Sequence, residues 1–495
     1  MYQSNRRKFL GGLSAAAAGA AFGLPGRARA QEKPTRFLIV LGASGGASII
    51  DGPLAIRASE SSAASRLNTF ADSLVTGIDG SPLRAVDLDR DAVGPIPIGF
   101  QARQSGFLQR HHQDMLVSTV RGTSVNHGIA QRRSVTGNEA WLGRTLQEMC
   151  ALEYGEGYPL ANVHLATGTA FTERGTDDSL PARCYGEQVA EPALWPLSLD
   201  GSKGLTAPSR DLIEAARTLR DERLDPRSRF ARVFAKSPEL QRWQNVRRTA
   251  VKPIESADLI SKLMLFPDSD TFPLSQYGLQ SSSAAQRVRE VFPNYDKDPL
   301  EAQAALAFLL LKFRVSVTVT LGPGNDVVLD REGDVQGLPD GSLTSTPIAF
   351  DFSHQSHRAT QALMWDRVYK IADGLITLLK EEELENGTSF WDRSLIYIPT
   401  EFGRTRERPE NAEDFGTGHH LNNGTLVISP MVKGDTILGG VDPNTALAYG
   451  WDPTTGEARP DSTMAERYTY AGLLDAMGVQ TTGSGLPSVT AFRRS

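Results

Sequence analysis

The sequence predicts an α/β fold built on a doubly wound, mostly parallel sheet. Apolar runs of strand length recur along the chain, and a polar, glycine-rich segment follows each of them directly. Long segments with helical periodicity separate these runs. The chain has 495 residues and is 40% hydrophobic, so it can bury a sizeable core and does not have the composition of a disordered protein.

Four segments show the strand pattern, and polar residues follow each of them. Residues 37–41 ("FLIVL") precede "GASGGASIIDG", and residues 115–120 precede "RGTSVNHG". Residues 315–321 precede "GPGND", and residues 395–398 precede "PTEFGRT". Continuous apolar runs are typical of strands that are buried on both faces, so the four segments predict strands of one parallel sheet.

Helices are predicted between the strands. Asp298 and Pro299 form a helix start ahead of "LEAQAALAFLLLKF", and apolar residues at helical spacing give the segment after Arg358 a buried face. Residues from about 190 to 297 are charged and helical in period. We interpret them as a helical insertion in a single domain of residues 31–495, rather than as a second catalytic domain.

Residues 1–30 have the pattern of a twin-arginine signal peptide. Two arginines stand in "SNRRKFLGG", a weakly apolar stretch follows over residues 10–24, and "ARA" at residues 28–30 forms a small-x-small cleavage site. The apolar stretch is shorter than the ~20 residues of a membrane span, so no stable span is expected. We predict export by the Tat translocase to a periplasmic or secreted location, with cleavage before Gln31.

The charge distribution argues against a nucleic-acid partner. The whole chain has a formal charge of −6, but its first thirty residues carry five basic residues and no acidic one, so the remainder stands at −11. An acidic body without a basic stripe is a poor match for a phosphate backbone.

Cys150 and Cys184 are the only cysteines of the chain. An oxidising compartment permits a disulfide between them, and two buried thiols are the equal alternative. Neither cysteine has metal-ligand neighbours, so no catalytic role is expected for them.

Side chains that bind divalent metals gather behind the predicted strands. In doubly wound sheets, ligands bind outside the carboxyl ends of the strands, and each of these segments leaves such an end or returns to it. Divalent ions prefer carboxylates and imidazoles that converge from separate loops. The sequence therefore predicts a site for zinc, calcium, magnesium or manganese at this edge. Its candidate residues are Asp51, His127, Asp351, His354, His357, Glu401, His419 and His420.

Each candidate also has a simpler interpretation. A lone histidine or aspartate on a loop is more often a cap or turn residue, and Asp51 and Asp351 could each form an Asx turn. Only convergence of several candidates would make a site. His111, His112 and His164 stand before or away from the predicted strand ends, so they are interpreted as structural.

Several motifs occur in an order that resembles a known family. "GGASIID", "NHGIAQRRSVTG", "AFDFSHQ", "TEFGRT", "GTGHH" and "TYAGLLDAMGV" follow one another between Arg36 and Val479. This pattern resembles the exported bacterial family called domain of unknown function 1501, which is similar to the alkaline phosphatase and sulfatase superfamily. The resemblance covers most of the mature chain and implies a sheet of alkaline phosphatase-like type.

The superfamily implies roles for individual positions. Its first-strand carboxylate ligand corresponds to Asp51, and its middle ligands correspond to Asp351 with His354 or His357. Its last histidine ligand corresponds to His419 or His420. In that superfamily two metals clamp the ester oxygens and activate a nucleophile.

The chain departs from the superfamily at two places. Glu401-Phe402 stands where metal-dependent members carry an Asp-His pair, so one ligand is changed and another is missing. His127 aligns with the nucleophile position, with Ser124 nearby at poorer spacing. A histidine there could be a nucleophile, an acid-base group or a ligand, and the sequence leaves these roles open.

Two classes of function follow. The first is an exported metal-dependent hydrolase of small-molecule or envelope phosphate or sulfate esters, with His127 and Arg404 as catalytic candidates. Arg404 would contact the anion, or alternatively form a surface ion pair with "ERPENAED". The second class is a catalytically degenerate member of the same fold that binds an envelope component. Phe402 favours degeneracy, whereas the retained histidines favour a working metal site.

Overall fold

The computed structural model describes residues 33–89, 101–166, 171–199, 208–256, 258–323 and 349–494. Residues 36–495 form one compact unit. The signal peptide predicted for residues 1–30 lies outside the described residues. Among the described helices, none has the length and apolar content needed to cross a membrane.

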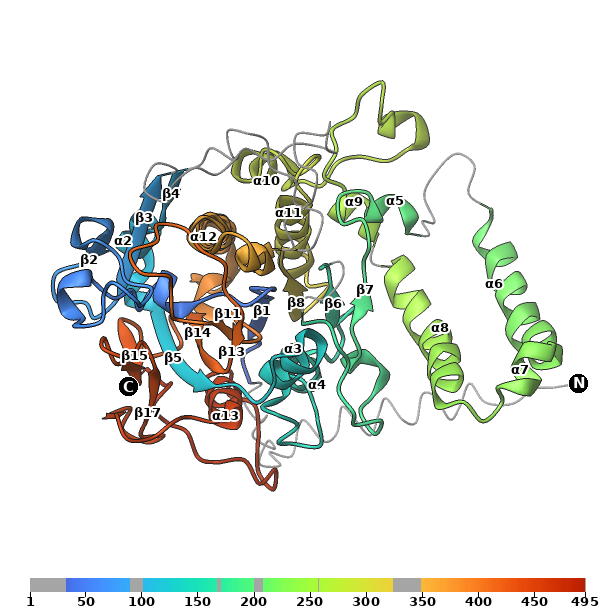
Figure 1. Ribbon diagram of the computed structural model, residues 1–495. Helices are drawn as coiled ribbons and strands as arrows, with labels where there is room; N and C mark the ends of the chain where they lie inside the picture. The colour runs from blue at the N-terminus through green and yellow to red at the C-terminus, as the bar shows by residue number, and fades with distance from the viewer. Residues whose placement is uncertain are drawn as a thin grey trace, which may run out of the picture. The chain divides into compact units, whose positions relative to one another are not determined.

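A mixed, mostly parallel sheet of eight strands lies at the centre of the α/β fold, in the order β15-β5-β14-β11-β1-β8-β6-β7 (Figure 1). Neighbouring strands are parallel except at β14, which runs antiparallel to both β5 and β11. The strands are β1 (Phe37–Leu41), β5 (Met115–Arg121), β6 (Asn162–His164), β7 (Glu187–Gln188), β8 (Thr318–Leu321), β11 (Ser394–Ile398), β14 (Asn422–Ile428) and β15 (Thr436–Leu438).

The four predicted strands all belong to this sheet, and three of them are adjacent. Strand β1 pairs in parallel with β11 on one side and with β8 on the other, so that Ile39 lies between Ile396 and Val319. Every residue of β1 is buried, as the continuous apolar run predicts. Strand β14 is not among the predicted strands, because its first residues, "NNGT", lack the continuous apolar run that marks the others.

Helices pack on both faces of the sheet (Figure 1). On one face α4 contacts β1, β6 and β8, and α13 packs against β5, α3 and α4. On the other face α11 contacts β8 and packs against α12. Helix α11 begins where the sequence predicts, with the Asp298 carboxylate accepting a hydrogen bond from the Leu300 amide at 2.9 Å. The helices are α3 (His127–Thr136), α4 (Leu146–Tyr154), α11 (Pro299–Lys312), α12 (His357–Glu381) and α13 (Glu466–Ala476).

The segment predicted as an insertion is helical in its described residues, which contain no strand between α5 and α10. Helix α8 meets the rest of the unit through Arg242, whose guanidinium lies 2.8 Å from the Asp178 carboxylate and 4.2 Å from the centre of the Tyr185 ring. The helices are α5 (Trp195–Ser198), α6 (Arg210–Leu219), α7 (Arg229–Val233), α8 (Pro238–Ser256), α9 (Leu259–Leu263) and α10 (Ala285–Val291), with a π-helical turn η7 (Arg220–Leu224) after α6.

Smaller elements complete the unit. Helix α2 (Gln104–His111) packs between the strand β3 and α12. The short sheets contain β2 (Val75–Gly77), β3 (Arg84–Asp89) and β4 (Gln101–Arg103); β9 (Glu383–Glu385) and β10 (Thr388–Ser389); β12 (Gly403–Arg404) and β13 (His419–His420); and β16 (Gly440–Val441), β17 (Ala448–Trp451) and β18 (Ala458–Arg459).

The two cysteines are buried free thiols, which is one of the two alternatives left by the sequence. Burial raises the pKa of the Cys150 thiol and also that of the Cys184 thiol. Both groups are therefore protonated near neutral pH and are poor nucleophiles and poor metal ligands.

Candidate metal-binding site

The candidate site lies at the edge of the sheet where the parallel strands end. Helix α3 follows β5, and the β12 segment follows β11. The histidines of β13 stand directly before β14. Because β14 is antiparallel to its neighbours, the residues that precede it lie at the same edge as the residues that follow β5 and β11. The unpredicted strand thus brings the histidine pair to the site.

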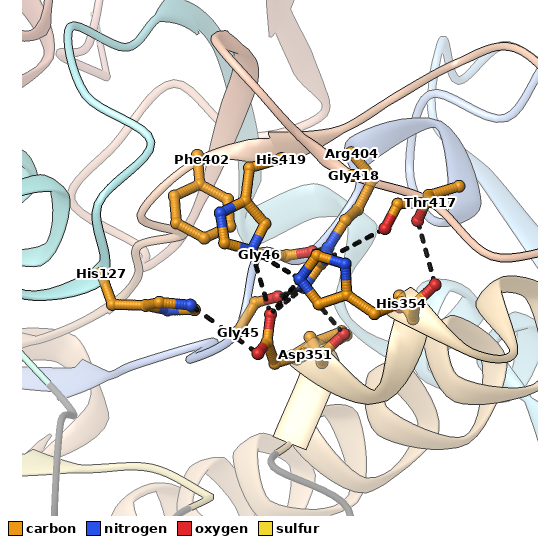
Figure 2. A network of polar contacts seen from close by, with 12 residues as sticks. Gly45, Gly46, His127, Asp351, His354, Phe402, Arg404, Thr417, Gly418 and His419 are labelled. Atoms are coloured by element: carbon orange, nitrogen blue, oxygen red, sulfur yellow. Dashed lines mark hydrogen bonds and ion pairs between the residues drawn. The ribbon is translucent and has the colours of Figure 1, made fainter.

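Four side chains meet there, and we refer to them as the Asp351 cluster (Figure 2). They are His127, Asp351, His354 and His419. One ligand atom each from His127, Asp351 and His419 lies within 4.8 Å of the others. The Asp351 carboxylate is 3.2 Å from His419 Nε2, 3.3 Å from His354 Nε2 and 3.7 Å from His127 Nε2. His354 Nε2 also lies 2.9 Å from His419 Nε2.

A second hydrogen bond orients two of these imidazoles. His419 Nδ1 donates to the backbone carbonyl of Val125 at 2.9 Å, and His127 Nδ1 donates to the Glu401 carboxylate at 2.9 Å. In each neutral ring this leaves the lone pair on Nε2, the atom that faces Asp351. Histidine ligands in proteins are commonly fixed in this way by a carbonyl or a carboxylate behind the ring.

The Asp351 carboxylate is held in its ionised form. Burial acts to raise its pKa, but the close polar contact with His419, the hydrogen bond from Arg404 and the charge of Arg404 hold that pKa well below the ordinary value. Burial lowers the pKa of His354, and the Arg404 charge lowers it further. The His127 pKa is raised, first through the hydrogen bond to Glu401. The cluster therefore combines a stable negative charge with a neutral imidazole near pH 7.

Arg404 is fully buried behind the cluster, with its side chain 0% exposed. Its guanidinium donates to the Asp351 carboxylate at 2.6 Å and to the carbonyls of Gly46 at 3.3 Å, Phe350 at 3.3 Å and Thr417 at 3.4 Å. The alternative of a surface ion pair is therefore wrong. Arg404 instead ties together three segments of the site, and these bonds leave it little capacity for an anionic ligand.

Two glycines allow the segments to approach each other. Gly45 has a φ of +95°, and a Cβ atom there would lie 2.2 Å from the Asp351 backbone nitrogen. Gly46 has a φ of +83°, and a Cβ atom would lie 2.6 Å from the Phe402 ring. The Gly45 amide also donates to the Glu401 carboxylate at 2.6 Å. Only glycine combines these backbone angles with this lack of space.

Phe402 packs against both oriented imidazoles. Its ring stacks on His419 with 4.0 Å between centroids and meets His127 edge-on at 5.1 Å. The Phe402 side chain is completely buried. The residue that replaces an expected ligand therefore supports the two histidines without binding an ion itself.

Asp51 and His357 lie in a separate buried network and not in the Asp351 cluster. The Asp51 carboxylate is 3.0 Å from His357 Nε2, and Asn68 donates to both of its oxygens at 2.9 Å. These two side chains are 2% and 1% exposed, because the 3-10 turn η1 (Ile49–Asp51) and the start of α12 direct them inward. His357 Nδ1 is 3.0 Å from the Thr417 hydroxyl. The network thus positions the segment that leads to His419.

Glu401 and His420 also differ in position from the ligands expected. Glu401 is an outer partner, because its carboxylate accepts from Gly45 and His127 and does not belong to the group of three converging ligand atoms. His420 Nδ1 accepts a hydrogen bond from the Asn422 amide at 3.0 Å. Successive residues of a strand point to opposite sides, so only His419 of the pair reaches Asp351.

The supporting groups were missed in the sequence. A backbone carbonyl such as that of Val125 leaves no residue-type signal, and in the sequence Phe402 is visible only as a missing ligand. The two glycines of "GGAS" follow a buried strand directly, and adjacent glycines at such a place are the signal that could have predicted the close approach to Asp351.

The fold and the site define this protein as an α/β protein with a mostly parallel sheet and a His-Asp group that could hold a metal ion. Comparison with known proteins goes no further: no family model matches the chain, and no curated protein matches it.

Proposed function

We propose that the protein is an exported, metal-dependent hydrolase of phosphate or sulfate esters with a sheet of alkaline phosphatase-like type. The observation that carries the proposal is the Asp351 cluster, in which His127, Asp351 and His419 offer one ligand atom each within 4.8 Å. Imidazole nitrogens with a carboxylate are suitable donors for a divalent ion. The proposal also rests on the motifs that resemble the alkaline phosphatase and sulfatase superfamily.

The chain's own residues would hold the ion and keep it accessible. His127, Asp351 and His419 would be its ligands, with Val125 and Glu401 fixing the two imidazoles from behind. When bound, a divalent ion acts as a Lewis acid on an ester oxygen and lowers the pKa of water from 15.7 toward ~7. The side chains of His127 and His354 are 36% and 44% exposed, so an ester can reach them from solvent.

His354 is the candidate for proton transfer. It is the most exposed imidazole of the cluster, and its lowered pKa keeps it neutral near pH 7. A neutral imidazole can accept a proton at a ring nitrogen from an attacking water and return it to the leaving oxygen. His127 begins helix α3, whose N-terminal end favours an anionic group such as a phosphate or sulfate ester.

A catalytically degenerate binding protein is the second candidate. The observation that favours it is Arg404, which already pairs with Asp351 at 2.6 Å in the buried interior. A carboxylate with a permanent cationic partner is a weaker ligand, because the two cations compete for its charge. Under this alternative the cluster would be a polar network that binds an envelope component without turnover.

The adjacent histidines provide a matched test. Elemental analysis of the purified protein should find a divalent metal, and the protein should hydrolyse aryl phosphate or aryl sulfate. His419→Ala and Asp351→Asn should lower metal occupancy and turnover together, whereas His420→Ala should leave both unchanged because its ring faces away. His354→Ala should reduce turnover more than metal occupancy.

Two results would decide against a hydrolase. A protein that takes up no divalent metal and cleaves no ester across a broad panel supports the binding alternative. Equal loss of activity in the His419→Ala and His420→Ala variants, with both proteins folded, would show that the Asp351 cluster is not the reaction site.

A further inference from the structure

The helical insertion exposes an unusual number of large apolar side chains. Among the described residues, ten of the fourteen large hydrophobic residues that are exposed belong to the insertion, and seven of these ten lie in the part from α6 to α8. Figure 1 shows these helices. The exposed fractions of the seven residues range from 47% to 66%. We call this set the insertion patch: Leu212, Leu219, Leu224, Phe230, Val233, Phe234 and Trp243.

The patch follows the periodicity of its helices. In α6, Leu212, Ala216 and Leu219 recur at the spacing of one helix face, and in α7 Phe230 and Val233 do the same with Phe234 at the helix end. Scattered exposed apolar residues are normal, but exposed apolar residues that recur on one face of neighbouring helices indicate a binding surface.

The charge around the patch is opposite to that of the rest of the chain. Residues 208–248 contain eleven basic and six acidic residues, a formal charge of +5. The whole chain stands at −6 and its first thirty residues carry +5, so residues 31–207 and 249–495 together carry −16. Ten of the eleven basic residues are arginines, whose long side chains can cover apolar surface while the guanidinium stays in water.

We propose that the insertion patch docks on the surface of an anionic phospholipid bilayer. Helices with leucine, phenylalanine and tryptophan on one face and basic residues around them lie in the interface of such bilayers. Residues 208–248, with their charge of +5, would be attracted to anionic headgroups, which would orient the −16 remainder of the mature chain away from the surface. This mode places the helices on the membrane and requires no spanning segment.

A second copy of this chain fits the patch less well. A symmetric dimer would place the patch against itself, and so would bring two +5 segments together. A bilayer supplies apolar depth and negative charge in the same place. The inference does not depend on the proposed hydrolase activity, because none of the patch residues belongs to the Asp351 cluster.

The test is flotation of the purified protein with lipid vesicles. Vesicles of phosphatidylcholine with phosphatidylglycerol should bind the protein, and vesicles of phosphatidylcholine alone should bind it at least tenfold less. The combined variant Arg223→Gln, Arg227→Gln and Arg229→Gln should weaken binding by about two orders of magnitude, since each basic residue contributes roughly fivefold. Added salt should reduce binding of the unmodified protein in the same direction.

The apolar half of the patch is tested separately. The combined variant Leu219→Ser, Phe230→Ser and Val233→Ser should lose vesicle binding by at least tenfold and keep its melting temperature, because these side chains are exposed. The control Leu142→Ser with Leu447→Ser changes leucines that are 64% and 38% exposed outside the insertion, and it should bind normally. All variants carry the same N-terminus, so differences among them report on the insertion alone.

Three outcomes would overturn the proposal. The first is equal binding of the protein to neutral and anionic vesicles. The second is equal vesicle binding by the Leu219→Ser, Phe230→Ser, Val233→Ser variant and by its control. The third is dimer formation through the insertion patch. Sedimentation velocity detects the last case: a dimer that becomes a monomer only in the patch variant, without vesicle binding by either form, would assign the patch to self-association.

Discussion

Replacing Glu401 by glutamine should weaken metal binding without unfolding the protein. Glu401 is 1% exposed, and its Oε1 accepts hydrogen bonds from His127 Nδ1 at 2.9 Å and from the Gly45 amide at 2.6 Å. Glutamine keeps an acceptor oxygen of similar size at that place but removes the negative charge. The geometry of the Asp351 cluster should therefore survive, while the electron-donating partner behind His127 is weakened.

The magnitude follows from the kind of bond that is lost. A hydrogen bond to a carboxylate is roughly twice as strong as a neutral one, and loss of such an outer partner lowers metal affinity by about 10–100-fold. Stability should change by less than about 1 kcal/mol, because the second oxygen of Glu401 is buried without a hydrogen-bond partner and a neutral side chain reduces that desolvation cost. The pKa of His127 should fall, since the Glu401 hydrogen bond is the main cause of its elevation.

Chelator competition would measure the affinity, and an NMR titration of the metal-free protein would give the His127 pKa. Glu466→Gln is the control, because Glu466 is also buried but accepts hydrogen bonds from Thr123 and not from an imidazole. An unchanged affinity and an unchanged His127 pKa in Glu401→Gln would refute the role assigned to Glu401. An equal affinity loss in Glu466→Gln would show a general effect of losing buried charge.

Three further predictions concern other parts of the chain. Gly45→Ala should lower the free energy of unfolding by about 3 kcal/mol and disturb the site, because a Cβ atom would lie 2.2 Å from the Asp351 backbone nitrogen. The control Gly80→Ala shares the positive φ, but its Cβ atom would meet no atom within 4 Å. In urea unfolding this control should lose only about 1 kcal/mol of unfolding free energy. Burial lowers the pKa of His164 to about 4 from 6.5, so between pH 4 and pH 6.5 the unfolded chain binds more protons than the folded protein. The free energy of unfolding should therefore fall by about 3 kcal/mol from pH 6.5 to pH 4. His164→Asn should reduce this pH dependence of the unfolding free energy. Changing Arg6 and Arg7 together to lysine should leave full-length protein inside the cell in a fractionation experiment, and normal export would reject the twin-arginine route.

The sequence predicted the strands with strong local signals and missed those without them. Residues 37–41 form a continuous apolar run, and the structure has β1 over the same range. Helix α11 starts at Pro299 because Asp298 caps it, and both residues are visible in the sequence. Strand β14 begins with "NNG", which is typical of turns, and its pairing with β5 and β11 depends on residues far away in the chain.

The candidate site was predictable in residue type but not in orientation. Asp351, His354 and His419 converge, and the sequence had placed them on returning segments of the right edge. The choice between His419 and His420 depends on the phase of a two-residue strand. The inward turn of Asp51 depends on Asn68 and on His357, which is 306 residues away, and no local pattern encodes such a partnership.

The bond between Gly45 and Glu401 also constrains when the site can form during biosynthesis. The two residues are 356 positions apart in the chain, and Arg404 reaches back a similar distance to Gly46. The ribosome must therefore synthesise most of the polypeptide before the Gly45-Gly46 segment can contact the Glu401–Arg404 segment. Because such long loops must close before their contacts stabilise anything, a nascent chain that ends before Glu401 lacks these bonds. The group of three ligand atoms is likewise complete only once His419 has been synthesised.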